Sequence, residues 1–276
     1  MSYGLPLPLH AGSCTALVTP FKNGAFDADN FCKLVDCQID NGTAALVPVG
    51  TTGESPTWSH EEHDLVVELC IKQAAGRVPV IAGAGSNSTA EAVRLARHAA
   101  AAGASAVLIV SPYYNKPTQA GLYAHFAAVA KAVDVPVIVY DIPGRSIVRM
   151  NDNTLAKLAS DYANISGIKD ATADLARPTI LHNMLGNTFT QLSGEDATAL
   201  PYLAAGGHGC ISVTANIAPK LLSDMHASWW AGDIAAAQLI HKKLLPVHEA
   251  MFCEASPGPV KYAASLLGIC ADEVRL

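Results

Sequence analysis

The sequence predicts a (β/α)8 barrel with a C-terminal helical appendage. Short apolar runs, many of them β-branched, recur along the 276 residues, and helical patterns lie between most of them. Continuous apolar strands that alternate with helices indicate a parallel sheet buried on both faces. Eight such units in about 215 residues fit this barrel, and an open, doubly wound sheet is the second possibility.

Each apolar run is taken as one strand. The eight expected strands occupy residues 14–18, 44–49, 78–82, 106–110, 136–140, 165–169, 188–192 and 209–212. Ser59 and Ser88 each precede a glutamate by three residues, which is typical of a capping box that opens a helix. Gly76 and Gly103 are expected to end helices.

Helical sequence continues after the last expected strand. One helix over 219–230 would close the barrel, and further helical patterns cover 233–253 and 257–267. We therefore expect the barrel, with its active site, over residues 11–230 and C-terminal helices over residues 231–276.

Composition excludes several classes of function. Half of the residues are hydrophobic and 15% are charged, so a large core can form. The net charge of −6 and the lack of a basic cluster argue against nucleic acid as a partner. The longest apolar run, 99–110, is too short to span a membrane, and no signal-peptide pattern precedes Lys22. Seven scattered cysteines without a C-x-x-C pair predict reduced thiols in the cytoplasm and no metal site.

Lys169 ends one of the apolar runs, in the segment Gly167-Ile168-Lys169-Asp170-Ala171. Lysine side chains are almost never fully buried unless they are paired, and burial disfavours the ammonium form. A desolvated lysine can therefore act as a nucleophile and form a Schiff base with a ketone. Taken alone, the segment favours the plainer interpretation, a lysine whose ammonium group reaches out of the strand end to water.

Other polar residues follow the expected strands at the barrel end where such folds carry their chemistry. They are Thr51, Thr52, Tyr113, Tyr114, Tyr140 and Arg145. The glycines around the two threonines suit an anionic group, although a plain turn is also compatible. Hydroxyl groups can relay protons, and arginine offers a planar fork for a carboxylate. Together with Lys169, these residues favour a Schiff-base lyase or aldolase.

Five segments together resemble the dihydrodipicolinate synthase family, within the pyruvate-dependent N-acetylneuraminate lyase superfamily. They are 50–55 (GTTGES), 113–117 (YYNKP), 140–145 (YDIPGR), 167–171 (GIKDA) and 212–216 (SVTAN). Each is a modest signal alone, whereas all five in this order are specific, and the resemblance covers residues 11–276. It implies a homotetrameric, allosteric lyase of lysine and diaminopimelate biosynthesis, built as a dimer of dimers.

The resemblance also implies a mechanism. Lys169 would form a Schiff base with pyruvate, and the derived enamine would attack L-aspartate 4-semialdehyde to give 4-hydroxy-tetrahydrodipicolinate, with no separate cofactor. Tyr140 would be the acid and base, linked through Thr52 to Tyr114, which reaches in from a neighbouring subunit. The implied substrate-binding groups are Thr51, Thr52, Arg145 and the carbonyl group of Ile211.

A second implied site is a regulatory one that binds L-lysine. In lysine-inhibited members of the family it uses residues that match Ser55, Pro56, His60, His63, Asn87, Glu91 and Tyr113. Glu91 would pair with the ammonium group of the inhibitor, and Asn87 would bind its main-chain-like groups. Two positions depart from the common pattern: small residues also occur at Pro56, and Trp58 replaces a common aliphatic residue.

Other interpretations of the same residues remain. His60 and His63 share a helix face as metal ligands do, but no third ligand lies nearby in the sequence, and solvated histidines are an alternative. The pattern Gly83-Ala84-Gly85 lacks the third glycine of a dinucleotide loop, which argues against NAD. N-acetylneuraminate lyases and keto-deoxy-sugar aldolases are the nearest alternative enzymes, and a non-catalytic barrel is a third. The intact set of expected catalytic residues argues against a non-catalytic barrel.

Overall fold

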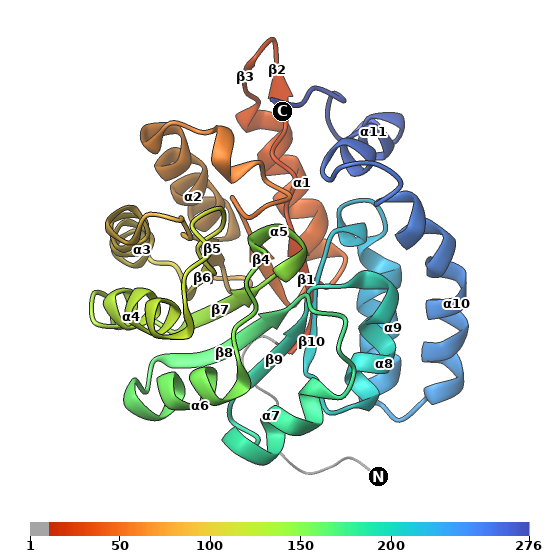
Figure 1. Cartoon of the computed structure of the whole chain (residues 1–276). Coiled ribbons are helices and arrows are strands. Elements are labelled where there is room, and N and C mark those ends of the chain that lie inside the picture. Colours follow the sequence, from red (N-terminus) through yellow and green to blue (C-terminus); the bar gives the residue numbers. More distant parts are fainter. Residues whose placement is uncertain (1–10, 276) are drawn as a thin grey trace.

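The protein is a closed barrel of parallel strands surrounded by helices. The computed structural model describes residues 11–275. Eight parallel strands form one sheet in the order β4-β1-β10-β9-β8-β7-β6-β5, and a parallel bridge between Leu46 and Val80 joins its two edges. Figure 1 shows the strands in the centre and the helices around them. The prediction of a (β/α)8 barrel is confirmed.

Each barrel strand overlaps the apolar segment expected for it. The strands are β1 (Gly12–Ala16), β4 (Ala45–Val47), β5 (Ile81–Gly83), β6 (Ala106–Val110), β7 (Val137–Asp141), β8 (Ile165–Asp170), β9 (Thr190–Ser193) and β10 (Gly209–Ser212). A short antiparallel hairpin of β2 (Phe21–Lys22) and β3 (Ala25–Phe26) follows β1. No periodic pattern marks this hairpin in the sequence, because each of its strands has only two residues.

Helices follow the strands along the chain. The barrel helices are α1 (Ala28–Asp40), α2 (His60–Ala74), α3 (Thr89–Ala102), α4 (Gln119–Ala130), α6 (Asp152–Asp161), α7 (Arg177–Leu185), α8 (Ala199–Ala204) and α9 (Pro219–Trp230). A one-turn helix, α5 (Pro143–Ser146), lies after β7. Beyond α9 come α10 (Ile234–Ala250) and α11 (Gly258–Leu266). The division of the chain at residue 230 stays a prediction, and Leu276 lies outside the described residues.

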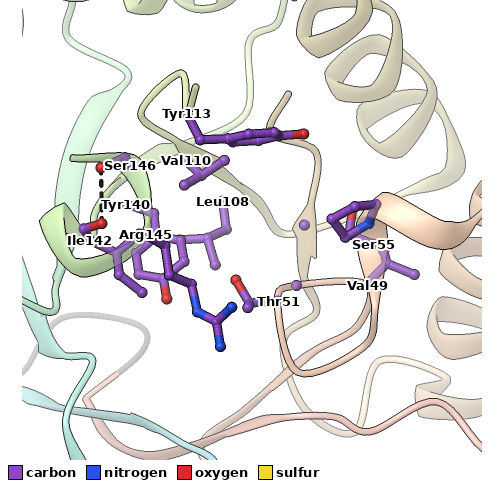
Figure 2. A pocket seen from close by; sticks show the side chains of 14 residues that line it. Val49, Thr51, Ser55, Leu108, Val110, Tyr113, Tyr140, Ile142, Arg145 and Ser146 are labelled. Atoms are coloured by element: carbon purple, nitrogen blue, oxygen red, sulfur yellow. Dashed lines mark hydrogen bonds between the residues drawn. The ribbon is translucent and has the colours of Figure 1, made fainter. Parts of the chain in front are cut away.

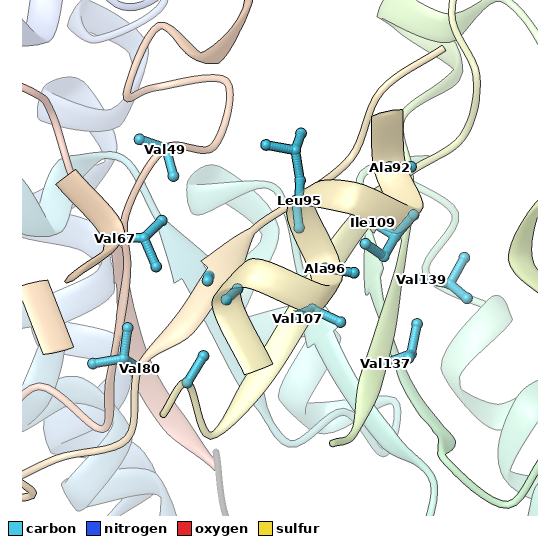
Figure 3. Packing of buried hydrophobic residues seen from close by; sticks show 14 of the residues in the cluster. Val49, Val67, Val80, Ala92, Leu95, Ala96, Val107, Ile109, Val137 and Val139 are labelled. Carbon is cyan, nitrogen blue, oxygen red and sulfur yellow. The ribbon is translucent and has the colours of Figure 1, made fainter. Parts of the chain in front are cut away.

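Alternating side chains along β6 and β7 fill two separate cores. Val107, Ile109, Val137 and Val139 face the surrounding helices and pack near Leu95 of α3 (Figure 3). The residues between them in β6 and β7 belong to a second cluster that fills the barrel interior. Because both faces of the barrel strands are buried, these strands appear in the sequence as continuous apolar runs.

The two predicted capping boxes differ in the structure. The Ser59 side chain accepts from the Glu62 backbone N–H, and the Glu62 carboxylate accepts from the Ser59 backbone N–H, so this box is complete. Ser88 accepts from the Glu91 backbone N–H, but the Glu91 carboxylate binds other side chains, so the second box is only half formed. Gly103 caps α3 in the left-handed conformation, as expected of a helix end.

Composition predicts no membrane-spanning segment and reduced thiols, and the fold bears on both predictions. None of the helices in residues 11–275 combines the length and the apolar character needed to cross a bilayer. All seven cysteines fall in this described range and are thiols rather than disulfides, four of them buried. Burial raises the pKa of the Cys14 thiol to about 12, which makes it a packing residue at neutral pH.

Candidate active site

Lys169 and Tyr140 lie side by side at the ends of two adjacent strands. They are register partners in the β7–β8 ladder, and the Lys169 Nζ atom lies 4.2 Å from the centroid of the Tyr140 ring. Each side chain is only 5% exposed. No carboxylate forms an ion pair with Lys169 in the part of the chain that the structure describes. A buried lysine without an ion-pair partner is unusual for a structural residue.

A pocket of about 250 Å³ opens beside Tyr140, whereas Lys169 lies behind the tyrosine and is not among the residues that line it. The predicted site residues that line it are Thr51, Ser55, Pro56, Tyr113, Tyr140 and Arg145. Apolar side chains, including Leu108 and Val110, complete its wall. Figure 2 shows Thr51, Tyr140 and Arg145 around one space, with the Tyr113 ring farther along the same wall. The pocket suits a small polar molecule that enters a largely apolar surrounding.

The loop after β4 brings backbone groups to the pocket. A Cβ atom on Gly83 would lie 2.4 Å from the carbonyl oxygen of Val49, so only glycine lets β5 approach this loop so closely. The loop is closed by hydrogen bonds from the amides of Gly53 and Ser55 to the carbonyl of Gly50. Thr51 faces the pocket and Thr52 is 4% exposed. The Gly53 and Ser55 amides are therefore already paired, and the Thr51 hydroxyl is the side-chain donor that this loop offers to a carboxylate in the pocket.

Tyr114 does not face the pocket of its own chain. It is 86% exposed and has a left-handed backbone with φ of 70°. Within residues 11–275, no hydrogen bond joins Thr52 to Tyr140 or to Tyr114. A bulky residue held at positive φ and directed to solvent is uncommon and needs an explanation. The predicted relay through these three hydroxyls stays a prediction.

Arg145 and Ile211 approach the site from different elements. Arg145 lies on α5, whose first residue is Pro143, and its Nη2 atom donates to the carbonyl of Ser256 at 3.3 Å. It lines the pocket mouth, where a guanidinium group can bind a carboxylate. Ile211 is 1% exposed and belongs to the interior cluster of the barrel beside Cys14.

The residues predicted for lysine binding also gather around one place. His60 Nε2 lies 2.5 Å from Glu91 Oε1, and Ser86 donates to the other oxygen of Glu91. These hydrogen bonds lower the pKa of the Glu91 carboxyl. Burial raises the pKa of Tyr113, and the negative charge of Glu91 adds to the effect.

The other predicted members of this set line the pocket or make contacts of their own. Ser55 and Pro56 line the pocket together with Tyr113. The carbonyl oxygen of Asn87 accepts from the side chain of Asn115 at 2.8 Å. His63 is buried, and burial lowers its pKa to about 4, so its imidazole is neutral near pH 7.

A buried ion pair that the sequence analysis missed anchors the loop of Thr51 and Thr52. Glu54 is fully buried in a left-handed conformation, and its carboxylate accepts from Lys261 Nζ at 2.7 Å and from the Arg275 backbone N–H at 2.8 Å. Lys261 also donates to the carbonyl of Thr19 at 2.9 Å. The GTTGES motif contained the acid, but its partner lies 207 residues away and carries no local signal.

A second buried cluster lies behind the strand ends that carry the lysine and the tyrosine. Asp141 and Asp170 directly follow Tyr140 and Lys169, and both bind the buried Arg177. Two aspartates at the ends of apolar strands were a signal in the sequence, because buried carboxylates need a cation or several donors.

Glu195 is a further acid near the lysine. Burial raises the pKa of its carboxyl, as does the charge of Asp196, whereas the charge of Lys169 lowers it. Glu195 follows β9, so it approaches Lys169 from the next strand around the barrel.

Comparison with known proteins identifies the family. The model of the Dihydrodipicolinate synthetase family matches residues 9–276. The 4-hydroxy-tetrahydrodipicolinate synthase of Bradyrhizobium diazoefficiens is 57% identical over 265 residues, which cover 96% of this chain and 89% of the relative.

Two solved structures are similar over nearly the whole chain. The chloride-inhibited dihydrodipicolinate synthase of Acinetobacter baumannii, complexed with pyruvate, is 45% identical with a TM-score of 0.93, covering 97% of this chain and 92% of that one. The enzyme of Cyanidioschyzon merolae with lysine bound is 37% identical with a TM-score of 0.92, covering 95% of this chain and 90% of that one. From its sequence, its barrel and these relatives, the chain belongs to the dihydrodipicolinate synthetase family.

Proposed function

We propose that this protein is a 4-hydroxy-tetrahydrodipicolinate synthase, which condenses pyruvate with L-aspartate 4-semialdehyde through a Schiff base on Lys169. The observation that carries the proposal is a lysine with 5% exposure, without an ion-pair partner in the described residues, against the Tyr140 ring at the edge of a pocket. A desolvated amine of this kind suits attack on a ketone. The names of the relatives and the pyruvate complex of one of them support the same reaction.

The proposed reaction proceeds in balanced steps. The Lys169 amine attacks the keto carbon of pyruvate, a C–N bond forms, and the keto oxygen leaves as water. Loss of a methyl proton converts the imine to an enamine, whose carbon atom attacks the aldehyde carbon of the second substrate and forms the C–C bond. The amine of that substrate then attacks the imine carbon, which closes the ring and breaks the bond to Lys169. The lysine supplies the electron sink, so the proposal includes no cofactor and no metal.

We assign the remaining roles by position. Tyr140 gives and takes protons at the Schiff base, beside which its ring lies. Thr51 and the loop amides bind the pyruvate carboxylate, and the carbonyl group of Ile211 faces the reacting atoms. Arg145 at the mouth binds the carboxylate of the semialdehyde.

The proposal includes a homo-oligomer, because Tyr114 is directed away from its own pocket, and a dimer of dimers, because the family resemblance implies it. An exposed tyrosine held at positive φ is explained if it enters the site of a partner subunit and joins a relay with Thr52.

The test is trapping of the Schiff base. Incubation with pyruvate and borohydride should give a reduced adduct that peptide mass spectrometry locates on Lys169. Lys169→Arg should abolish it, whereas Lys157→Arg, on an exposed lysine of α6, should leave it intact. Absence of an adduct on Lys169 would defeat the mechanism. An adduct without turnover of aspartate semialdehyde would indicate a sugar-type aldolase instead.

We also propose that L-lysine inhibits the enzyme at the set of Ser55, Pro56, His60, His63, Asn87, Glu91 and Tyr113. The lysine-bound relative supports this proposal, as does the ionised Glu91 beside Tyr113. The ammonium group of lysine would replace His60 on Glu91. A lysine titration at millimolar concentration should inhibit the native enzyme, and Glu91→Gln should weaken inhibition while turnover is kept. Equal turnover with and without lysine would exclude this regulation.

A further inference from the structure

The strand ends that carry the proposed catalytic pair also carry two buried aspartates. In the ladder between β7 and β8, Tyr140 pairs with Lys169 and Asp141 pairs with Asp170. Side chains alternate along a strand, so the tyrosine and the lysine face the barrel interior while both aspartates face the helices. The two aspartates are 0% and 2% exposed, respectively. Tyr140 and Lys169 therefore face the barrel interior, and the next residue on each strand, Asp141 or Asp170, faces outward.

One guanidinium group holds both aspartates. Arg177, the first residue of α7, is 0% exposed, and its Nη1 atom lies 2.7 Å from Asp141 Oδ2 and 3.3 Å from Asp170 Oδ1. Its Nε atom donates to Asp152 Oδ1 of α6 at 2.8 Å, and Nη2 donates to the carbonyl of Met150 at 2.9 Å. Arg177 thus connects two strand ends with the helices outside them.

The charges of these side chains explain why an arginine makes this connection. Adjacent buried carboxylates repel each other unless a cation lies between them. Burial disfavours the guanidinium charge, yet Asp170 and Asp141 raise the pKa of Arg177 above its ordinary value, so it stays charged. A planar fork with several fixed donors can reach both carboxylates and Met150 together, which the single ammonium group of a lysine cannot do.

We propose that Arg177 is a positioning residue for the reaction. By fixing the separation of Asp141 and Asp170, it fixes the register neighbours Tyr140 and Lys169, and so the place of the phenol over the amine. The inference rests on the proposed Schiff-base function of Lys169. It adds that the geometry of the pair is set from the outer face of the barrel, by a residue that does not touch the substrate.

The test compares Arg177→Lys with the native enzyme. The rate at which pyruvate and borohydride modify Lys169 is measured per folded molecule, with folded protein isolated by gel filtration and checked by circular dichroism. We expect about a 100-fold slower rate, because a displacement of about 1 Å at a reacting pair has that effect. The KM for pyruvate should stay close to native, because Thr51 and its loop lie on another strand. A merely structural role would lower the yield of folded protein but not the rate per folded molecule.

Asp152→Asn is the matched control. It weakens a contact of the same guanidinium group with α6 but leaves both strand contacts, so its trapping rate should be close to native. If Arg177→Lys does not fold, Asp170→Asn gives the same comparison, because it weakens one strand contact directly.

Each outcome decides the proposal. A native rate in folded Arg177→Lys, or in Asp170→Asn where that variant is used, overturns it. So does an Asp152→Asn variant as slow as the strand-contact variant. A native enzyme that forms no adduct on Lys169 defeats the proposed function and this inference together, whereas a native adduct with unchanged variants defeats the inference alone.

Discussion

At the scale of single residues, the proposed chemistry depends on the contact between Tyr140 and Lys169. The amine lies 4.2 Å from the ring centroid, and both groups are buried. A positioned acid and base contributes about 100-fold or more, so we expect Tyr140→Phe to lower kcat by at least that factor. The KM for pyruvate should change little, because the loop around Thr51 remains. Steady-state assays with both substrates measure the two constants.

Tyr123 provides the control for this substitution. It lies on α4, where its hydroxyl group donates to Asp161 at 2.5 Å, away from the pocket residues. Tyr123→Phe removes the same atom from the protein and should leave kcat unchanged. Native kcat in Tyr140→Phe would contradict the assigned role.

Single residues differ in how well the sequence predicts them. Lys169 was predictable because a charged residue at the end of an apolar strand is a local anomaly. Arg177 was not, because Ala176-Arg177-Pro178 resembles the exposed start of any helix, and its partners lie up to 36 residues away. The burial of Lys261 could not be predicted for the same reason. Burial of a charge depends on which distant residues fold around it, and sequence periodicity does not contain that information.

At the scale of helices and strands, local sequence patterns predict which elements form better than they predict the hydrogen bonds at their ends. The apolar runs predicted all eight barrel strands because burial on both faces removes polar residues from them. The pattern of Ser88 and Glu91 equals that of Ser59 and Glu62, yet only the latter forms a full capping box. Glu91 binds His60, which is 31 residues away, and this contact replaces the local one.

The packing of α4 on α3 predicts a pH dependence of stability. His125 of α4 is 3% exposed, lies 2.9 Å from the Thr89 hydroxyl through Nδ1, and has a pKa that burial lowers to about 4. The unfolded value is near 6.5, so the folded state favours the neutral ring. This contribution is fully present above pH 6.5 and is lost as the pH falls toward 4, by roughly 3 kcal/mol. Urea unfolding at several pH values measures it.

His125→Gln serves as the comparison, because glutamine is neutral at every pH in this range. Whatever its stability at pH 7, its free energy of unfolding should fall less steeply between pH 6.5 and 4 than that of the native protein. His63 has the same lowered pKa and remains in both proteins, so it cancels from the difference. Parallel curves would rule out the assigned role of His125.

At the scale of the whole molecule, the exposed Tyr114 predicts sites shared between subunits. Chains with Lys169→Ala and chains with Tyr114→Ala should each have little activity. If they are mixed, unfolded and refolded together, half of the dimers are hybrids, and each hybrid has one intact site, so roughly a quarter of the native activity should return. The assay is turnover per total chain after removal of denaturant.

This experiment needs one control and has one contrary outcome. Refolding of each variant alone controls for activity that returns without exchange. Recovery equal to the sum of the separate variants would mean that Tyr114 acts within its own chain or not at all.

The anchor of the Thr51 loop has a consequence for how the protein is made. Glu54 is held by Lys261, 207 residues further along the chain, and by the backbone of Arg275. At a synthesis rate of about 5–20 residues per second, roughly 10 to 40 s separate the emergence of the two ion-pair partners from the ribosome. A nascent chain therefore has all eight barrel strands before it has a fixed binding loop. The first turnover therefore waits for α11 and the residues that follow it rather than for the closure of the barrel.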